Sequence, residues 1–150
     1  MRMRCGFTTE ASAEQVLRAY TDFTDRRLET WRDTLRPEDF AVVDVGDTWA
    51  VVREGSLRMG VVLRYEWDDP GGVRWTLLES TFCQRGAGRL TVTPREEGGA
   101  RVEIAIEEHG PKGVLGPVVL ALKGLLGPHV LARASKRSLD RFAREDRAAS

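Results

Sequence analysis

The chain has few cysteines, no leader-like N-terminus and no surplus of charge of either sign. Cys5 and Cys83 lie far apart and without metal-type spacing, which excludes a disulfide framework and a zinc site. The first ten residues hold no apolar segment of the kind that directs secretion. With 23 basic and 23 acidic side chains in 150 residues, the chain lacks the excess of cations that nucleic-acid binding requires. We expect a cytoplasmic protein with no nucleic-acid partner.

The common catalytic and cofactor motifs are also missing. The sequence contains no GxSxG, no HExxH, no P-loop and no dinucleotide fingerprint. His109 and His129 are the only histidines, and neither has a partner at ligand spacing. We therefore expect no metal ion and no cofactor.

One long apolar run, residues 114–132, raises the question of a membrane span. Lys123 lies near its middle, and two prolines and several glycines interrupt it. A spanning helix needs about 20 apolar residues with few charges. The run instead indicates an amphipathic or core-facing helix without stable membrane insertion.

The composition is that of one globular domain. Hydrophobic residues make up 41% of the chain and charged residues 31%, and there are no repeats or low-complexity linkers. A length of 150 residues is enough for a substantial core. We predict a single domain over residues 1–150.

Periodicity divides the chain into three parts. After a first strand over residues 2–8, a capping box at Ser12–Gln15 predicts a helix, and a second short helix is expected over 26–32. The pattern then alternates with period 2, and short turns separate the expected strands 39–45, 48–54, 57–67, 73–83, 88–95 and 100–108. From Pro117 a helical pattern returns, with a break or kink predicted at Gly127–Pro128 and an end near Arg144. Because such short connections join only antiparallel neighbours, the prediction is an α+β fold with a seven-stranded antiparallel sheet and a long C-terminal helix.

One face of this sheet is predicted to be apolar. Registering strands 57–67 and 73–83 through the Pro70–Gly71 turn pairs Tyr65 with Trp75 and places Glu79 opposite Val61. The inward-facing set on the sheet is Met59, Val61, Leu63, Tyr65, Trp67, Trp75, Leu77, Glu79, Leu90, Val92, Val102, Ile104 and Ile106.

Glu79 and Tyr65 are the candidate chemical groups of that face. A buried carboxylate has a raised pKa and can act as a general acid or base, whereas a slipped register or an ion pair would make Glu79 purely structural. Tyr65 and Trp75 form either ordinary core or a stacking wall for a flat ligand, with the Tyr65 hydroxyl as a polar handle. Arg53 and Glu54 could orient a polar ligand group, or could form a surface ion pair.

Strands 39–45 and 48–54 are apolar on both faces. Pairing through Gly55–Ser56 favours Ala41, Val43 and Val45 inward. The outer face, with Phe40 and Trp49, is then a candidate patch for a homodimer.

Several short motifs resemble the SRPBCC (START-like) superfamily. They are Thr21-Asp22-Phe23, Trp31, Val45-Gly46-Asp47-Thr48-Trp49-Ala50, Arg53-Glu54-Gly55-Ser56, Tyr65-Glu66-Trp67, Val73-Arg74 and Val92-Thr93-Pro94. The sequence is most similar to the bacterial group described as polyketide cyclase/dehydrase and lipid transport. The resemblance implies a helix-grip fold, in which the sheet wraps around the long helix and encloses a hydrophobic cavity.

The resemblance also implies a function. Met59, Val61, Leu63, Trp67, Trp75, Leu77, Leu90, Val92, Ile104 and Leu122 would contact a hydrophobic small molecule, either a lipid or an aromatic polyketide. The first hypothesis is a non-catalytic binder or carrier. The alternatives are a polyketide cyclase/dehydratase that uses Glu79 and Tyr65 for proton transfer, and a regulatory or interaction module.

Overall fold

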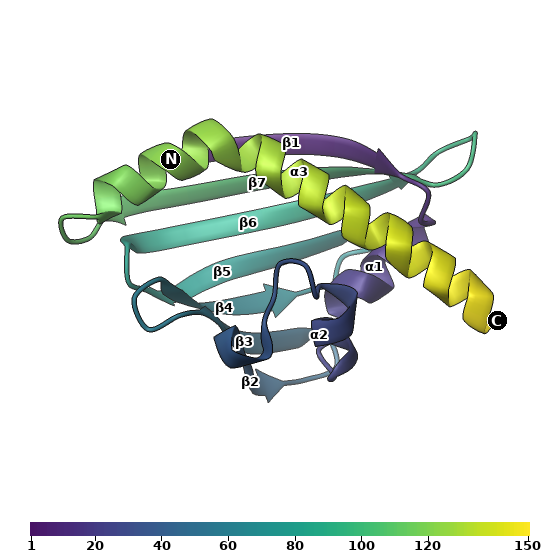
Figure 1. Cartoon of the computed structure of the whole chain (residues 1–150), viewed down its shortest axis with the longest axis horizontal. Coiled ribbons are helices and arrows are strands. Elements are labelled where there is room, and N and C mark those ends of the chain that lie inside the picture. The colour runs from purple at the N-terminus through teal and green to yellow at the C-terminus, as the bar shows by residue number, and fades with distance from the viewer.

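Seven strands form one antiparallel sheet, and a 34-residue helix, α3, crosses one face of it (Figure 1). The computed structural model describes residues 1–150. The strands follow the order β1-β7-β6-β5-β4-β3-β2 across the sheet, so β2 to β7 form a meander and β1 is added beside β7. Their bounds are β1 Arg2–Thr9, β2 Phe40–Val45, β3 Trp49–Gly55, β4 Gly60–Glu66, β5 Gly72–Ser80, β6 Cys83–Pro94 and β7 Ala100–Pro111.

Two short helices and a 3-10 turn connect β1 to β2. They are α1 (Ala13–Thr21), α2 (Arg26–Thr30) and η1 (Pro37–Asp39). The predicted capping box opens α1: the Gln15 amide donates to Ser12 Oγ at 3.1 Å, and the Ser12 amide donates to Gln15 Oε1 at 2.9 Å. The predicted fold class, a helix-grip fold with a seven-stranded antiparallel sheet, is confirmed.

The last helix continues through the position of the predicted break or kink. α3 (Gly116–Ala149) runs through Gly127 and Pro128 without a break. Proline lacks the N–H of a helical hydrogen bond and crowds the carbonyl four residues earlier, so it bends a helix that continues past it. Figure 1 shows α3 changing direction as it crosses the sheet.

The predicted register holds only in part. Tyr65 faces Trp75 and Leu63 faces Leu77, as expected. A bulge then inserts Leu78, so that Glu79 pairs with Val62 and points to the exposed face of the sheet. Since side chains alternate between faces, one extra residue reverses every later assignment in that strand. The prediction that Glu79 faces inward is therefore wrong.

The edge strand β2 contains a second bulge, between Val42 and Asp44. Phe40 pairs with Glu54 and Val42 with Val52, which places both on the inner face and reverses the prediction for Ala41 and Phe40. Val43 and Val45 are exposed instead. On the outer face Arg64 lies over the Trp49 ring at 4.6 Å and covers part of the expected dimer patch. A homodimer through this edge stays a prediction.

The core lies between the sheet, α1 and the C-terminal half of α3. Its fully buried side chains include Val16 of α1, Leu90 of β6 and Leu139 of α3. Asp140 fixes α3 to the end of β1, because it accepts from the Thr9 hydroxyl at 2.6 Å and from the Glu10 amide at 2.9 Å. These contacts attach the C-terminal half of α3 to the sheet.

Candidate functional site

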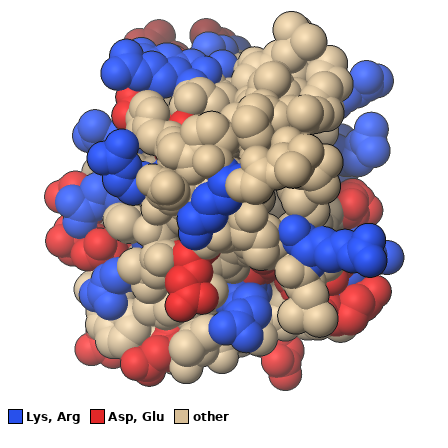
Figure 2. All heavy atoms as spheres, turned by 90° about the vertical axis from the view of Figure 1, so that its left-hand side faces the viewer, with Lys and Arg blue, Asp and Glu red and all other residues tan.

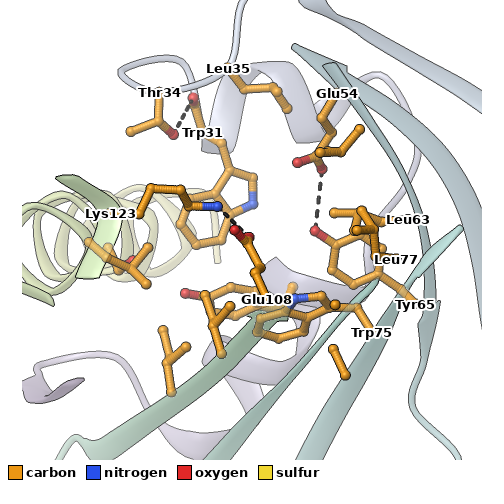
Figure 3. A pocket seen from close by; sticks show the side chains of 18 of the residues that line it. Trp31, Thr34, Leu35, Glu54, Leu63, Tyr65, Trp75, Leu77, Glu108 and Lys123 are labelled. Carbon is orange, nitrogen blue, oxygen red and sulfur yellow. Dashed lines mark hydrogen bonds and ion pairs between the residues drawn. The ribbon is translucent and has the colours of Figure 1, made fainter. Parts of the chain in front are cut away.

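A cavity of about 370 Å³ lies between the sheet and α3 (Figure 3). Strands β3 to β7 form one wall, residues 123–135 of α3 form another, and α1, α2 and the segment after α2 close the third. Of its 20 lining residues, 13 are hydrophobic. This size and lining lie within the range of small-molecule pockets, roughly 300–1,000 Å³ and mostly apolar.

The structure brings six of the predicted site residues to this cavity. They are Val61, Leu63, Tyr65, Trp75, Leu77 and Ile104. The alternation of β4 and the first half of β5 places most of them there, before the bulge reverses the faces.

The other predicted contact residues lie elsewhere. Leu90 and Val92 are packed in the core, and Trp67 stacks on Phe23 with ring centroids 5.5 Å apart. Met59 is exposed because residues 56–59 form a turn, so that β4 begins only at Gly60. Leu122 is exposed on the outer side of α3, and its neighbour Lys123 lines the cavity instead.

Glu79 is not part of the cavity. It lies in a surface depression on the opposite side of the sheet, together with Arg53 and Arg58. A general acid or base inside the cavity must come from other side chains.

One polar cluster at the cavity wall combines Arg27, Glu54 and Tyr65. The Tyr65 hydroxyl donates to Glu54 Oε1 at 3.3 Å. The buried Arg27 donates from Nη1 to the carbonyls of Tyr20 at 3.1 Å and Asp22 at 3.4 Å. Its guanidinium lies over the Phe23 ring at 4.0 Å, and its Nε has no partner.

Burial makes Glu54, Tyr65 and the nearby Tyr20 resist ionisation. It raises the pKa of Glu54, although the Arg27 charge and the Tyr65 hydrogen bond act against the rise. Burial and the nearby Glu54 carboxylate raise the pKa of the Tyr65 phenol, and burial raises the pKa of Tyr20 to about 12. Glu54 is thus shifted toward the range in which a carboxylate exchanges protons near neutral pH.

A second polar pair, Glu108 and Lys123, lines the cavity near its α3 side (Figure 3). Lys123 Nζ donates to Glu108 Oε1. The other carboxylate oxygen, Oε2, is buried and has no partner. A buried acceptor without a partner has a free-energy cost that a ligand donor group can remove.

Sequence reasoning missed this pair, although β7 carried the signal for half of it. Val102, Ile104 and Ile106 were placed on the inner face, and continuing the same alternation reaches Glu108. In the sequence, Lys123 indicates only that the apolar run is not a membrane span. Arg27 gave no signal, because its burial depends on how α2 packs against Phe23 and Tyr65.

Histidines and cysteines do not gather in or near this cavity. His109 lies in β7, with its Nε2 3.7 Å from Glu107 Oε2. No group of three or more His, Cys, Asp or Glu side chains in the structure could hold a metal ion.

The sequence profile of the family described as "Polyketide cyclase / dehydrase and lipid transport" matches residues 7–145. The chain belongs to this family. No curated protein matches the chain. The predicted membership of the START/SRPBCC superfamily is confirmed by this match and by solved structures of the same fold.

Three solved structures show how widely this fold is shared. The Zhui aromatase/cyclase of Streptomyces sp. R1128 is 15% identical with a TM-score of 0.74, over 100% of this chain and 98% of its own. The protein TTHA0849 of Thermus thermophilus is 21% identical with a TM-score of 0.72, over 97% and 99%. A START superfamily protein of Mycobacterium smegmatis is 13% identical with a TM-score of 0.67, over 96% and 97%. At such identities the likeness shows the fold alone.

Proposed function

We propose that this family member binds one hydrophobic small molecule in the cavity between the sheet and α3, as a carrier or binding protein. The observation that carries the proposal is the cavity itself, about 370 Å³ in volume with 13 hydrophobic residues among the 20 that line it. Burial of apolar ligand surface there would supply most of the affinity, at about 25 cal/mol per Å². In this proposal the protein is soluble and cytoplasmic and needs no metal or cofactor.

The polar groups of the cavity narrow the class of ligand. The volume lies near the lower end of the usual range, which favours a single acyl chain or a compact ring system over a two-chain lipid. Glu108 Oε2 can accept from a ligand hydroxyl, and Arg27 Nε can donate to a ligand oxygen. An amphipathic ligand that carries hydroxyl and carbonyl groups, such as an aromatic polyketide, can form hydrogen bonds with both of these protein atoms, whereas a plain hydrocarbon chain cannot.

The direct test is to identify what the cavity holds. Native mass spectrometry of the freshly purified protein, followed by organic extraction, would show any bound mass. Titration with cis-parinaric acid and with a hydroxylated anthraquinone, followed by the fluorescence of the cavity-lining Trp31 and Trp75, would then compare the two ligand classes. An empty protein that takes up neither probe would contradict the proposal.

A matched pair of variants shows whether such binding uses the cavity. Ala134 lines the cavity, whereas Ala121 of the same helix is exposed. We expect Ala134→Phe to weaken probe binding at least tenfold and Ala121→Phe to leave it unchanged. Equal affinities in both variants would place the bound molecule outside the cavity.

The Glu54–Tyr65 pair favours a second candidate function, an aldol-type cyclisation of a poly-β-ketone. Glu54 would accept a proton from the methylene carbon between two carbonyls, and that carbon would attack a ketone further along the chain. Tyr65 would give its proton to the new alkoxide and recover one from Glu54 through their 3.3 Å hydrogen bond. The protein ends as it began, and no oxidant or reductant is consumed.

Substitution of Glu54 distinguishes the two candidate functions, because it should affect substrate conversion and ligand binding differently. If the protein is a cyclase, Glu54→Gln should abolish conversion of a poly-β-ketone mimic while binding of the anthraquinone survives. The control is Glu79→Gln, because Glu79 is the carboxylate that the β5 bulge turns to the other side of the sheet. If the wild-type protein converts no such substrate, the binding function stands alone.

A further inference from the structure

The N-terminal half of α3 presents most of its large apolar side chains outward, although Leu120 is buried. Five of these side chains, which we call the α3 apolar stripe, are between 51% and 72% exposed: Val118, Leu122, Leu125, Leu126 and Val130. Their spacing of three or four residues keeps most of them along one side of the helix. Only 11% of the most apolar 18-residue window of α3 is buried, although by length and composition this helix could cross a membrane.

The inner side of the same segment carries small residues instead. A side chain at Gly127 would meet Met3 Sδ at 2.5 Å, and one at Gly124 would meet Met1 Cγ at 3.3 Å. These glycines let the helix lie close to the start of β1. Apart from the buried Leu120, this segment turns glycines toward the protein and leucines toward the outside, which is the opposite of the usual arrangement of a surface helix. An exposed apolar area of this kind marks an interaction site.

The segment that carries the stripe has charges of one sign in its own sequence, although Lys123 and Lys136 pair with Glu108 and Asp140 just outside it. Residues 109–139 contain five Lys and Arg and no Asp or Glu. Arg133 and Arg137 continue α3 beyond the stripe, are exposed and form no side-chain hydrogen bond or ion pair. Before the helix, Val114 is 92% exposed and follows Lys112 closely in sequence. Figure 2 shows a large uncharged area on this side of the molecule, with Lys and Arg and also some Asp and Glu around it.

We propose that the α3 apolar stripe docks reversibly on an anionic lipid surface. An amphipathic helix with an apolar side and flanking basic residues lies in the plane of such an interface, with its leucines among the acyl chains and its arginines at the headgroups. A second copy of the chain fits this surface less well, because a symmetric dimer would bring two basic faces together.

The α3 apolar stripe lies on the same helix that forms one wall of the cavity. Lys123 and Leu131 line the cavity from the helical segment that carries the stripe. Docking would therefore bring the α3 wall of the cavity to the lipid surface. This inference goes beyond the proposed binding function and does not depend on which ligand the cavity holds.

Vesicle flotation of the full chain tests the proposal. The vesicles are phosphatidylcholine alone and phosphatidylcholine with about 30% phosphatidylglycerol, an anionic lipid. We expect flotation with the anionic vesicles, at least tenfold weaker partition onto neutral ones, and loss of binding as the salt concentration rises. Replacing Leu125 and Leu126 together by Gln should reduce partition at least tenfold. Replacing Arg133 and Arg137 by Gln should lower partition onto the anionic vesicles alone.

The matched control is the double replacement of Val43 and Val45 by Gln, since these two β2 side chains are also apolar and more than half exposed. It should bind vesicles as the wild type does. Circular dichroism checks that every variant is folded. Failure of the folded wild type to float with anionic vesicles would overturn the proposal, as would equal losses in the leucine and valine variants. A dimer that the leucine variant dissociates, without vesicle binding by the wild type, would assign the stripe to self-association instead.

Discussion

The hydroxyl of Tyr65 on β4 donates to a carboxylate oxygen of Glu54 on β3, 3.3 Å away, at the wall of an apolar cavity. Glu54 lies opposite Val61, so its backbone is far from the position paired with Tyr65, and only the length of the tyrosine side chain closes the contact. The pair unites a half-buried acid and a buried phenol whose pKa values are both raised. The pair is therefore the candidate acid–base group of the cavity.

The raised pKa of Glu54 makes a prediction about stability and pH. The folded state holds this proton more tightly than the unfolded chain, whose carboxyl pKa is about 4.3. Stability contributed by the neutral form is therefore lost as the pH rises from that value through the folded pKa. The Glu54→Gln variant has no carboxyl group to ionise at this position and does not lose stability in this way. Between the unfolded and the folded pKa of Glu54, its free energy of unfolding should therefore rise with pH relative to that of the wild type. Urea unfolding at several pH values measures it, and a constant difference would contradict the raised pKa.

The bulges in β2 and β5 are the features of this fold that the sequence pattern did not predict. The number of strands, their antiparallel order and the pairing of Tyr65 with Trp75 follow from alternation and short turns. The extra residue at Leu78 leaves no mark in the alternation, because Leu77 and Leu78 are equally apolar and either could face inward. One undetected residue was enough to turn Glu79 to the wrong face.

Site residues could be predicted where the alternation along a single strand places them. They could not be predicted where their orientation depends on how one element packs against another. Glu108 could have been found by extending the β7 alternation by one step. Lys123 is different, because the cavity-facing side of α3 is set by the close approach of Gly124 and Gly127 to β1. No pattern within α3 itself shows that Leu122, Leu125 and Leu126 face away from the sheet.

A glycine opposite Trp75 controls the shape of the cavity wall. Gly88 pairs with Trp75 across β5 and β6, and a side chain at Gly88 would overlap the indole ring. We expect Gly88→Ala to displace Trp75, to cost about 1–3 kcal/mol in stability, and to weaken binding of cis-parinaric acid. Intrinsic fluorescence and the probe titration measure these effects. Gly72→Ala is the control, because its new methyl would meet only Leu90 O at an ordinary 3.4 Å. Equal behaviour of the two variants would mean that Trp75 does not shape the binding site.

The two halves of α3 should respond differently to loss of a leucine. Leu139 is fully buried in the core, whereas Leu125 is 72% exposed in the α3 apolar stripe. Leu139→Ala should lower the free energy of unfolding by about 2–5 kcal/mol, since it leaves a cavity. Leu125→Ala should change it by less than about 0.5 kcal/mol. Chemical denaturation compares them, and a large cost at Leu125 would show that another surface covers the stripe in solution.

Asp140 should be the main polar anchor of α3. Burial acts to raise the pKa of its carboxyl, but the hydrogen bonds from Thr9, the Glu10 amide and Lys136 together lower it. Asp140→Ala removes these charge-assisted bonds and leaves the Thr9 hydroxyl without its partner, so we expect a cost of about 1–3 kcal/mol in urea unfolding. Glu145→Ala, which breaks an exposed pair with Arg32, should cost about 0–1 kcal/mol. The stability that the Asp140 carboxylate contributes should also depend on pH. Because the pKa of Asp140 is lower in the folded state, this stability is complete above the usual carboxyl range and is lost as the pH falls through the folded pKa. A difference between wild type and Asp140→Ala that persisted unchanged into strong acid would show that the side chain acts through packing and not through its charge.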